Sequence, residues 1–123
     1  MWKAVLMVAL GGACGSVVRF LTQKFFTHWH PFSFPAGTFV VNIFGCLLIG
    51  FLYGLTTRYS FLSSEIRLLL MTGFCGGFTT FSAFALEGYG LLQADRFVTF
   101  FVYFAGSVIL GLTATFTGIW VTR

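Results

Sequence analysis

Charged residues are absent from two long stretches of this chain, 35–57 and 97–122. A helix needs about 20 mostly apolar residues to cross the hydrocarbon core of a bilayer, so each stretch predicts a membrane-spanning helix. Only 8% of the 123 residues are charged and 58% are hydrophobic, whereas soluble domains carry about 25% charged residues. We therefore expect an all-α integral membrane protein, with four spanning helices in one domain over residues 1–123.

Polar turns separate the apolar segments and place the helix ends. The expected helices cover residues 3–26, 35–57, 64–92 and 97–121. Pro35 fits the first turn of the second helix, and Ser63 or Ser64 fits the N-cap of the third. Trp29, in the turn before the second helix, suits the headgroup region of a membrane.

Basic residues are divided between the two sides of the membrane. Four spanning helices place both termini and the turn between the second and third helices on one side. That side carries Lys3, Arg58, Arg67 and Arg123, and the other side carries Lys24 and Arg96. Positive charge accumulates on the cytoplasmic side, but a difference of four against two is small. The chain could insert in one orientation or in both, and insertion in both would allow an antiparallel dimer.

The third helix contains a segment, residues 73–84, whose composition is poor for a helix. Each of its glycines costs roughly 1 kcal/mol relative to Ala inside a helix; they are Gly73, Gly76 and Gly77. It also carries hydroxyl side chains where lipid offers no partner, at Thr79, Thr80 and Ser82. We expect a break near residues 73–80, which a membrane tolerates only inside protein or along a watery path. Breaks of this kind bind ions in transporters, so the segment predicts an ion or solute pathway.

Arg19 lies deep in the first helix, where an arginine costs at least about 2.5 kcal/mol on insertion scales. Gly11, Gly15 and Arg19 share one helical face by their i, i+4 spacing, and the glycines allow a neighbouring helix to approach closely. The arginine could extend toward the membrane interface. It could instead place a positive charge at a pore mouth, where it would attract anions.

The second helix carries a polar face of small residues, formed by Thr38, Asn42 and Gly45. An amide inside a membrane can join helices by hydrogen bonding. It can also donate two N–H bonds to an anion. Both interpretations stay open for Asn42.

The fourth helix carries a hydroxyl group or a glycine at every fourth position, at Tyr103, Ser107, Gly111 and Thr115. Residues at this spacing lie on one face of the helix. Their hydroxyls could replace water around a small ion in transit. Alternatively, the serine and threonine could bond to carbonyls four residues earlier in their own helix.

Two aromatic residues and one acidic residue of the third helix also bear on the pathway. Phe81 and Phe84 are neighbours by their i, i+3 spacing, and with 18 Phe in the chain such a pair can simply fill space. The positive edge of an aromatic ring could also hold an anion. Glu87 is the one acid well inside a predicted span. An intramembrane carboxylate marks a functional site by default; it could carry protons or make a structural hydrogen bond.

Several classes of function find no support in the sequence. The net charge of +4 is spread along the chain without a basic run, which argues against nucleic-acid binding. Cys14, Cys46 and Cys75 fit neither a disulfide framework nor a zinc site, and we interpret them as small packing residues. The sequence shows no nucleophile–base pair or metal-ligand cluster, so an enzyme is not expected.

Taken together and in order, these motifs resemble the CrcB/Fluc family of fluoride channels over essentially the whole chain. Three of them are Gly11-Gly12-x-x-Gly15-x-x-x-Arg19-Phe20, Gly37-Thr38-x-x-x-Asn42-x-x-Gly45 and Tyr103-x-x-x-Ser107. The most specific one runs Gly73-Phe74-x-Gly76-Gly77-Phe78-Thr79-Thr80-Phe81-Ser82-x-Phe84-x-x-Glu87.

The resemblance implies an antiparallel, dual-topology homodimer in the inner membrane of a bacterium, with two pores and a structural sodium ion at its centre. It also implies a passive, electrogenic channel that exports fluoride from the cytoplasm, with fluoride, the lipid bilayer and a second copy of the chain as partners. The carbonyls of Gly76 and Thr79 would hold the sodium ion, and Arg19 would lie in an aqueous vestibule. The implied fluoride pathway comprises Asn42, Phe81, Phe84, Tyr103, Ser107, Thr80, Ser82, Thr38 and Glu87.

Two other functions stay open. A small proton-coupled multidrug exporter has the same size and the same four helices. Its essential carboxylate lies in the first helix, where this chain has Arg19, so Glu87 would have to replace it. A non-transporting assembly subunit could bind partner helices through its small-residue faces, which leaves the broken helix unexplained.

Overall fold

The computed structural model describes residues 1–27, 34–60 and 62–122. It contains four helical spans that are long and apolar enough to cross a membrane: α1 (Trp2–Phe25), α2 (Ala36–Arg58), a third span over Ser64–Gln93, and α6 (Phe97–Thr122). The expected all-α fold with four spans is confirmed, and each helix end lies within one residue of its predicted position.

Pro35 and Ser63 lie at the N-caps of the second and third spans. Pro35 lies at the N-cap of α2, one residue before the first turn in which we expected it. Ser63 caps the third span as predicted, because its hydroxyl accepts the N–H of Ile66 at 3.3 Å. Trp29 and Arg123 lie outside the described residues.

The third span consists of several helical segments. These are α3 (Ser64–Arg67), the π-helix η2 (Leu68–Cys75), α4 (Gly76–Phe78) and α5 (Phe81–Gln93). Only Thr79 and Thr80, between α4 and α5, have extended backbone. The helix is therefore interrupted at these two residues.

The predicted break near residues 73–80 is too wide, since residues 73–78 stay helical. Two of the three glycines of this stretch, Gly73 and Gly77, serve close packing instead, whereas a Cβ on Gly76 would meet nothing within 4 Å. A Cβ on Gly73 would lie 2.9 Å from backbone atoms of α1, and a Cβ on Gly77 would lie 2.6 Å from the carbonyl oxygen of Gly12. This close backbone approach offsets the propensity cost on which the prediction rested.

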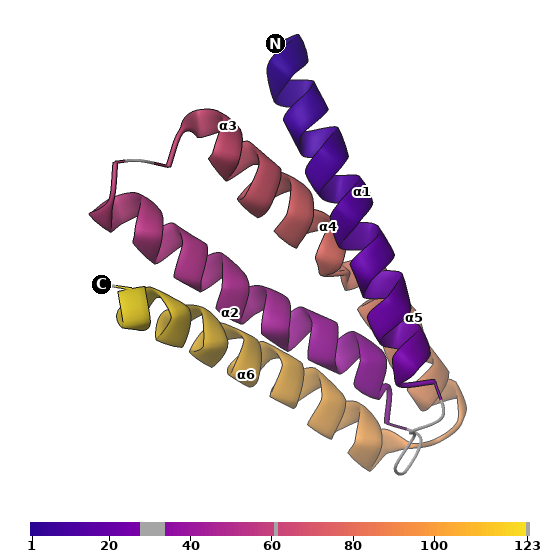
Figure 1. The fold of residues 1–123 in the computed structure, drawn as a ribbon. Coiled ribbons are helices and arrows are strands. Elements are labelled where there is room, and N and C mark those ends of the chain that lie inside the picture. Colours follow the sequence, from indigo (N-terminus) through magenta and orange to yellow (C-terminus); the bar gives the residue numbers. More distant parts are fainter. Residues whose placement is uncertain (28–33, 61, 123) are drawn as a thin grey trace.

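The spans pack mainly as two pairs (Figure 1). α2 lies along α6, and α1 lies along η2 and α4. The spans come together at the end that carries the α5–α6 connection and splay apart toward the two termini. Small residues bring each pair close. A Cβ on Gly15 would collide with the carbonyl oxygen of Phe74, and a Cβ on Gly118 with that of Leu47.

Candidate functional site

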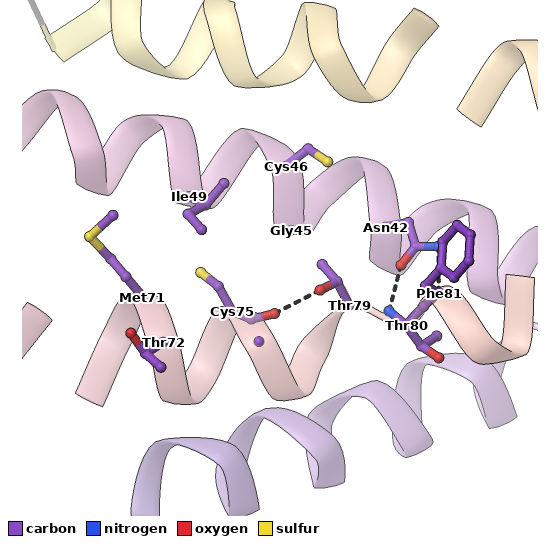
Figure 2. Close-up of a pocket in the computed structure, with 11 residues that line it drawn as sticks. Asn42, Gly45, Cys46, Ile49, Met71, Thr72, Cys75, Thr79, Thr80 and Phe81 are labelled. Atoms are coloured by element: carbon purple, nitrogen blue, oxygen red, sulfur yellow. Dashed lines mark hydrogen bonds between the residues drawn. The ribbon is translucent and has the colours of Figure 1, made fainter. Parts of the chain in front are cut away.

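Asn42 of α2 binds the interrupted backbone through both ends of its amide (Figure 2). Its Nδ2 donates to the carbonyl oxygen of Thr80 at 3.0 Å, and the N–H of Thr80 donates to its Oδ1 at 2.8 Å. The hydroxyl of Thr80 then caps α5 by accepting the N–H of Ala83 at 3.1 Å, and it lies 3.3 Å from the hydroxyl of Ser82. Asn42 therefore joins two helices, and this contact uses one of the two N–H groups of its amide.

Because of these contacts, two backbone carbonyl groups lack the N–H donors that they would have in a continuous helix. In a continuous helix the N–H of Thr80 would donate to Gly76, and the N–H of Ala83 would donate to Thr79. Here the first donates to Asn42 and the second to the Thr80 hydroxyl. The carbonyl oxygens of Gly76 and Thr79 can therefore accept another donor or bind a cation.

Arg19 reaches the break from α1. Its Nε donates to the carbonyl oxygen of Gly77 at 3.0 Å, and its Nη1 donates to Oε1 of Gln23 at 3.4 Å. The side chain is neither fully buried nor fully exposed. Bonds from a charged donor are stronger than neutral ones, so this contact ties α1 to α4 beside the break.

Gln23 is a member of the site that the sequence motifs did not single out. Its Nε2 donates to Oγ1 of Thr38 at 3.0 Å, which links α1 to α2. The signal that could have found it is its i, i+4 spacing from Arg19, which places both side chains on one face. The polar face predicted for α2 is thus a contact face: Thr38 meets Gln23, Asn42 meets the break, and Gly45 lies against the side chain of Thr79.

A second cluster lies between α2, α5 and α6. The hydroxyl of Tyr103 donates to Oε1 of Glu87 at 3.2 Å. Tyr103 and Thr38 are each 1% exposed. Glu87 makes the structural hydrogen bond that was one of its two predicted roles.

Aromatic rings lie between this cluster and the break. The ring centroids of Phe81 and Phe84 are 5.9 Å apart, which confirms that they are neighbours. The ring of Phe84 lies 5.0 Å from that of Tyr103. Phe81, in contrast, is 80% exposed, so one ring of the pair is packed and the other is open.

The face of α6 that carries Tyr103 does not behave as one continuous track. The hydroxyl of Thr115 bonds to the carbonyl of Gly111 at 3.1 Å and to that of Cys46 in α2 at 3.2 Å. It therefore follows the backbone-bonding alternative. Within the part of the chain that the structure describes, the buried Oγ of Ser107 has no hydrogen-bond partner. A buried polar atom of this kind calls for a water or a ligand.

Besides a cavity of about 240 Å³ that is lined by Phe84 and Tyr103 among others, two cavities adjoin these groups. The larger, of about 450 Å³, lies between α2 and the third span and is bordered at the break by Asn42, Thr80 and Phe81 (Figure 2). The smaller, of about 220 Å³, includes Gln23 and Glu87 in its lining. The predicted site residues therefore form two groups, one around the break and one around Tyr103, with Arg19 and Gln23 between them.

These features define a small, multi-pass α-helical membrane protein with an interrupted span and hydrogen-bonded polar groups between its helices. Residues 6–119 match the family described as CrcB-like protein, Camphor Resistance (CrcB). The chain belongs to this family, as the sequence motifs predicted.

Curated relatives named fluoride-specific ion channel FluC match nearly the whole chain. The protein from Phocaeicola vulgatus is 46% identical over 121 residues, covering 98% of this chain and 99% of the relative. The protein from Flavobacterium psychrophilum is 44% identical and covers 98% of both. The protein from Chlorobium luteolum is 47% identical over 116 residues, covering 94% of this chain and 89% of the relative. Together with the four spans, these bacterial relatives make the chain a multi-pass bacterial membrane protein.

Proposed function

We propose that this protein is a passive, fluoride-selective ion channel that exports fluoride from the cytoplasm. The observation that carries the proposal is the nearly full-length likeness to relatives named fluoride-specific ion channels, at 46% and 44% identity. The geometry supports it, because neutral hydrogen-bond donors and aromatic rings lie at the break and around Tyr103. The charge of Arg19, proposed to lie in an aqueous vestibule, is held by protein acceptors.

Fluoride is small and strongly hydrated, so a pore must offer donors as it removes water. The hydroxyl of Ser107 and the second N–H of Asn42 can donate, while Phe81 and Phe84 can present positive ring edges. None of these groups carries a full positive charge. An ion can therefore leave as well as enter, which conduction requires.

We propose that the channel is an antiparallel homodimer with two pores. Phe81 is 80% exposed, and the larger cavity opens beside it at the break. A second copy of the chain would cover both. The distribution of basic residues permits insertion in the two opposite orientations that such a dimer needs.

We further propose that a structural sodium ion sits where the two breaks meet. The carbonyls of Gly76 and Thr79 would hold it, since the N–H groups that would pair with them in a continuous helix donate to Asn42 and Thr80. Unwound carbonyls of discontinuous helices coordinate sodium in transporters. A bound cation would replace the missing donors and add positive potential near the anion path.

Release of fluoride from liposomes tests the proposed function. Purified protein is reconstituted with internal potassium fluoride, and release is followed with a fluoride electrode before and after a potassium ionophore is added. Chloride is measured in parallel. Fast fluoride release only with the ionophore, without chloride release, supports an electrogenic and selective channel. No release from folded dimers refutes it, and pH-driven efflux of lipophilic cations that Glu87→Gln abolishes would favour the exporter instead.

A further inference from the structure

Asn42 acts on two backbone carbonyl groups through a single hydrogen bond (Figure 2). The N–H of Thr80 donates to Oδ1 of Asn42 at 2.8 Å. In a continuous helix this N–H would donate to the carbonyl oxygen of Gly76, four residues earlier. The bond to Asn42 therefore keeps the Gly76 carbonyl free of its helical donor.

The same hydrogen bond orients the carbonyl group of Thr79. The C=O of Thr79 and the N–H of Thr80 belong to one peptide group, which is trans and therefore planar, with these two bonds pointing in opposite directions. Because the N–H points to Asn42, the carbonyl of Thr79 must point away from the Asn42 amide.

The other polar atoms of Thr79 are held by the preceding turn. Its N–H and its hydroxyl both donate to the carbonyl oxygen of Cys75, each at 3.0 Å. The N–H of Ala83, which would reach the Thr79 carbonyl in a continuous helix, donates to the hydroxyl of Thr80 instead. The Thr79 carbonyl is thus fixed in direction while its helical donor is engaged elsewhere. A ligand that is fixed before binding loses less freedom when a cation arrives.

We propose that Asn42 is a positioning residue of the sodium site, besides the fluoride pathway to which we assign it. Its Oδ1 keeps the third span open at Thr80, so that the carbonyls of Gly76 and Thr79 are available together. Without this acceptor the N–H of Thr80 can return to Gly76, which closes the helix and occupies one of the two carbonyls. The inference rests on the proposed function, and in particular on the proposed sodium ion.

The two ends of the Asn42 amide then serve different ions. Oδ1 acts on the sodium ligands. Nδ2 uses one N–H for the carbonyl of Thr80, at 3.0 Å, and keeps the second N–H for fluoride. Asn42→Asp separates the two ends, because a carboxylate still accepts the N–H of Thr80 but has no hydrogen to donate.

Sodium binding can be observed at the break itself, because two threonines follow each other only at 56–57 and 79–80. Threonine labelled with carbon-13 at the carbonyl and with nitrogen-15 gives NMR signals from these two directly bonded pairs when carbonyl and nitrogen are correlated. The pair at 79–80 reports on the break, and the pair at 56–57, inside α2, is an internal reference. Labelled dimers are titrated with sodium, which replaces N-methylglucamine at constant ionic strength.

In the wild type, we expect sodium to shift the Thr79 carbonyl signal and to leave the Thr56 signal in place. Asn42→Leu should need about threefold to tenfold more sodium for half of the shift, which is the effect of one neutral hydrogen bond. Asn42→Asp should need no more sodium than the wild type and yet release little fluoride. Thr115→Val is the matched control, because it also removes a hydrogen bond to α2, at the carbonyl of Cys46, and it should titrate like the wild type.

Equal sodium dependence in Asn42→Leu and the wild type would overturn the inference, and so would a folded Asn42→Asp variant that has lost the sodium response. If Asn42→Leu does not fold, Asn42→Ala takes its place. A Thr79 signal that ignores sodium in a protein that releases fluoride would overturn the sodium site and this inference but leave the channel. A normal sodium titration in a protein that releases no fluoride would refute the proposed function and keep the role of Asn42 at the break.

Discussion

Replacement of Asn42 by alanine should destabilise the protein, because the amide of Asn42 binds the interrupted backbone of the third span. The change removes both hydrogen bonds to Thr80 and leaves one backbone N–H and one carbonyl without these partners. An unsatisfied buried group costs about 1–3 kcal/mol, and single side-chain bonds in membrane bundles average about 0.6 kcal/mol. For two groups that are only partly buried, we expect a loss of about 1–4 kcal/mol, which is roughly fivefold to 1,000-fold in the unfolding equilibrium.

The loss in the free energy of unfolding can be measured by reversible unfolding in mixed micelles, with circular dichroism as the readout. Thr113→Ala is the control, because the Thr113 hydroxyl bonds to a carbonyl of its own helix on the exposed side. Its expected effect on the free energy of unfolding is within about 0.5 kcal/mol.

Asn42→Asp provides a second test of the Asn42 contacts. A carboxylate still accepts the N–H of Thr80 but repels its carbonyl, so this variant should regain stability in acid, where a protonated carboxyl can donate.

Equal stability of Asn42→Ala and Thr113→Ala would refute the reasoning. So would an Asn42→Asp variant whose stability does not change in acid. Either result would mean that the backbone at Thr80 is stabilised by something other than the Asn42 amide.

The close helix packing, the aromatic pair and Arg19 each give a further prediction. Gly15→Ala should cost more than about 2 kcal/mol in unfolding, because its Cβ would collide with the Phe74 carbonyl; Gly90→Ala, which meets nothing within 4 Å, should be neutral or stabilising. Phe81→Ile and Phe84→Ile should each abolish fluoride release while the dimer persists by light scattering, and undiminished release in both would exclude the ring edges. Arg19→Lys should lower stability by about 1–2 kcal/mol, because one ammonium cannot reproduce both guanidinium bonds, and wild-type stability would show that the bond to Gly77 contributes little.

The helices were predictable because they depend on short-range composition. The uncharged stretches 35–57 and 97–122 left little choice in where the spans lie, and Ser63 marked a helix start by its own side chain. The extent of the break was not predictable in this way. Helix propensity counts the glycines against the helix, whereas the contacts of Gly73 and Gly77 with α1 depend on tertiary packing.

Most residues of the site could be predicted from the sequence, but the contacts between them could not. Thr38, Asn42 and Gly45 could be placed on one face from their spacing. The contact of Asn42 with Thr80, 38 residues away, depends on how two helices are aligned along each other, which no local pattern encodes. Gln23 was missed because a glutamine near a helix end is ordinary, although its spacing from Arg19 was visible. The buried Oγ of Ser107, which has no hydrogen-bond partner among the described residues, could be identified only once its neighbours were in place.

The groups that hold the break have a consequence for biosynthesis. Arg19 and Asn42 lie in α1 and α2, so the ribosome makes them before it makes Thr79 and Thr80. When the interrupted segment enters the membrane, the donors for Gly77 and Thr80 are already there. The nascent chain therefore need not expose the carbonyl of Gly77 or the backbone groups of Thr80 unpaired to lipid, which would cost several kcal/mol per group. A circular permutant beginning at residue 64 would reverse this order, and we expect it to insert with lower yield.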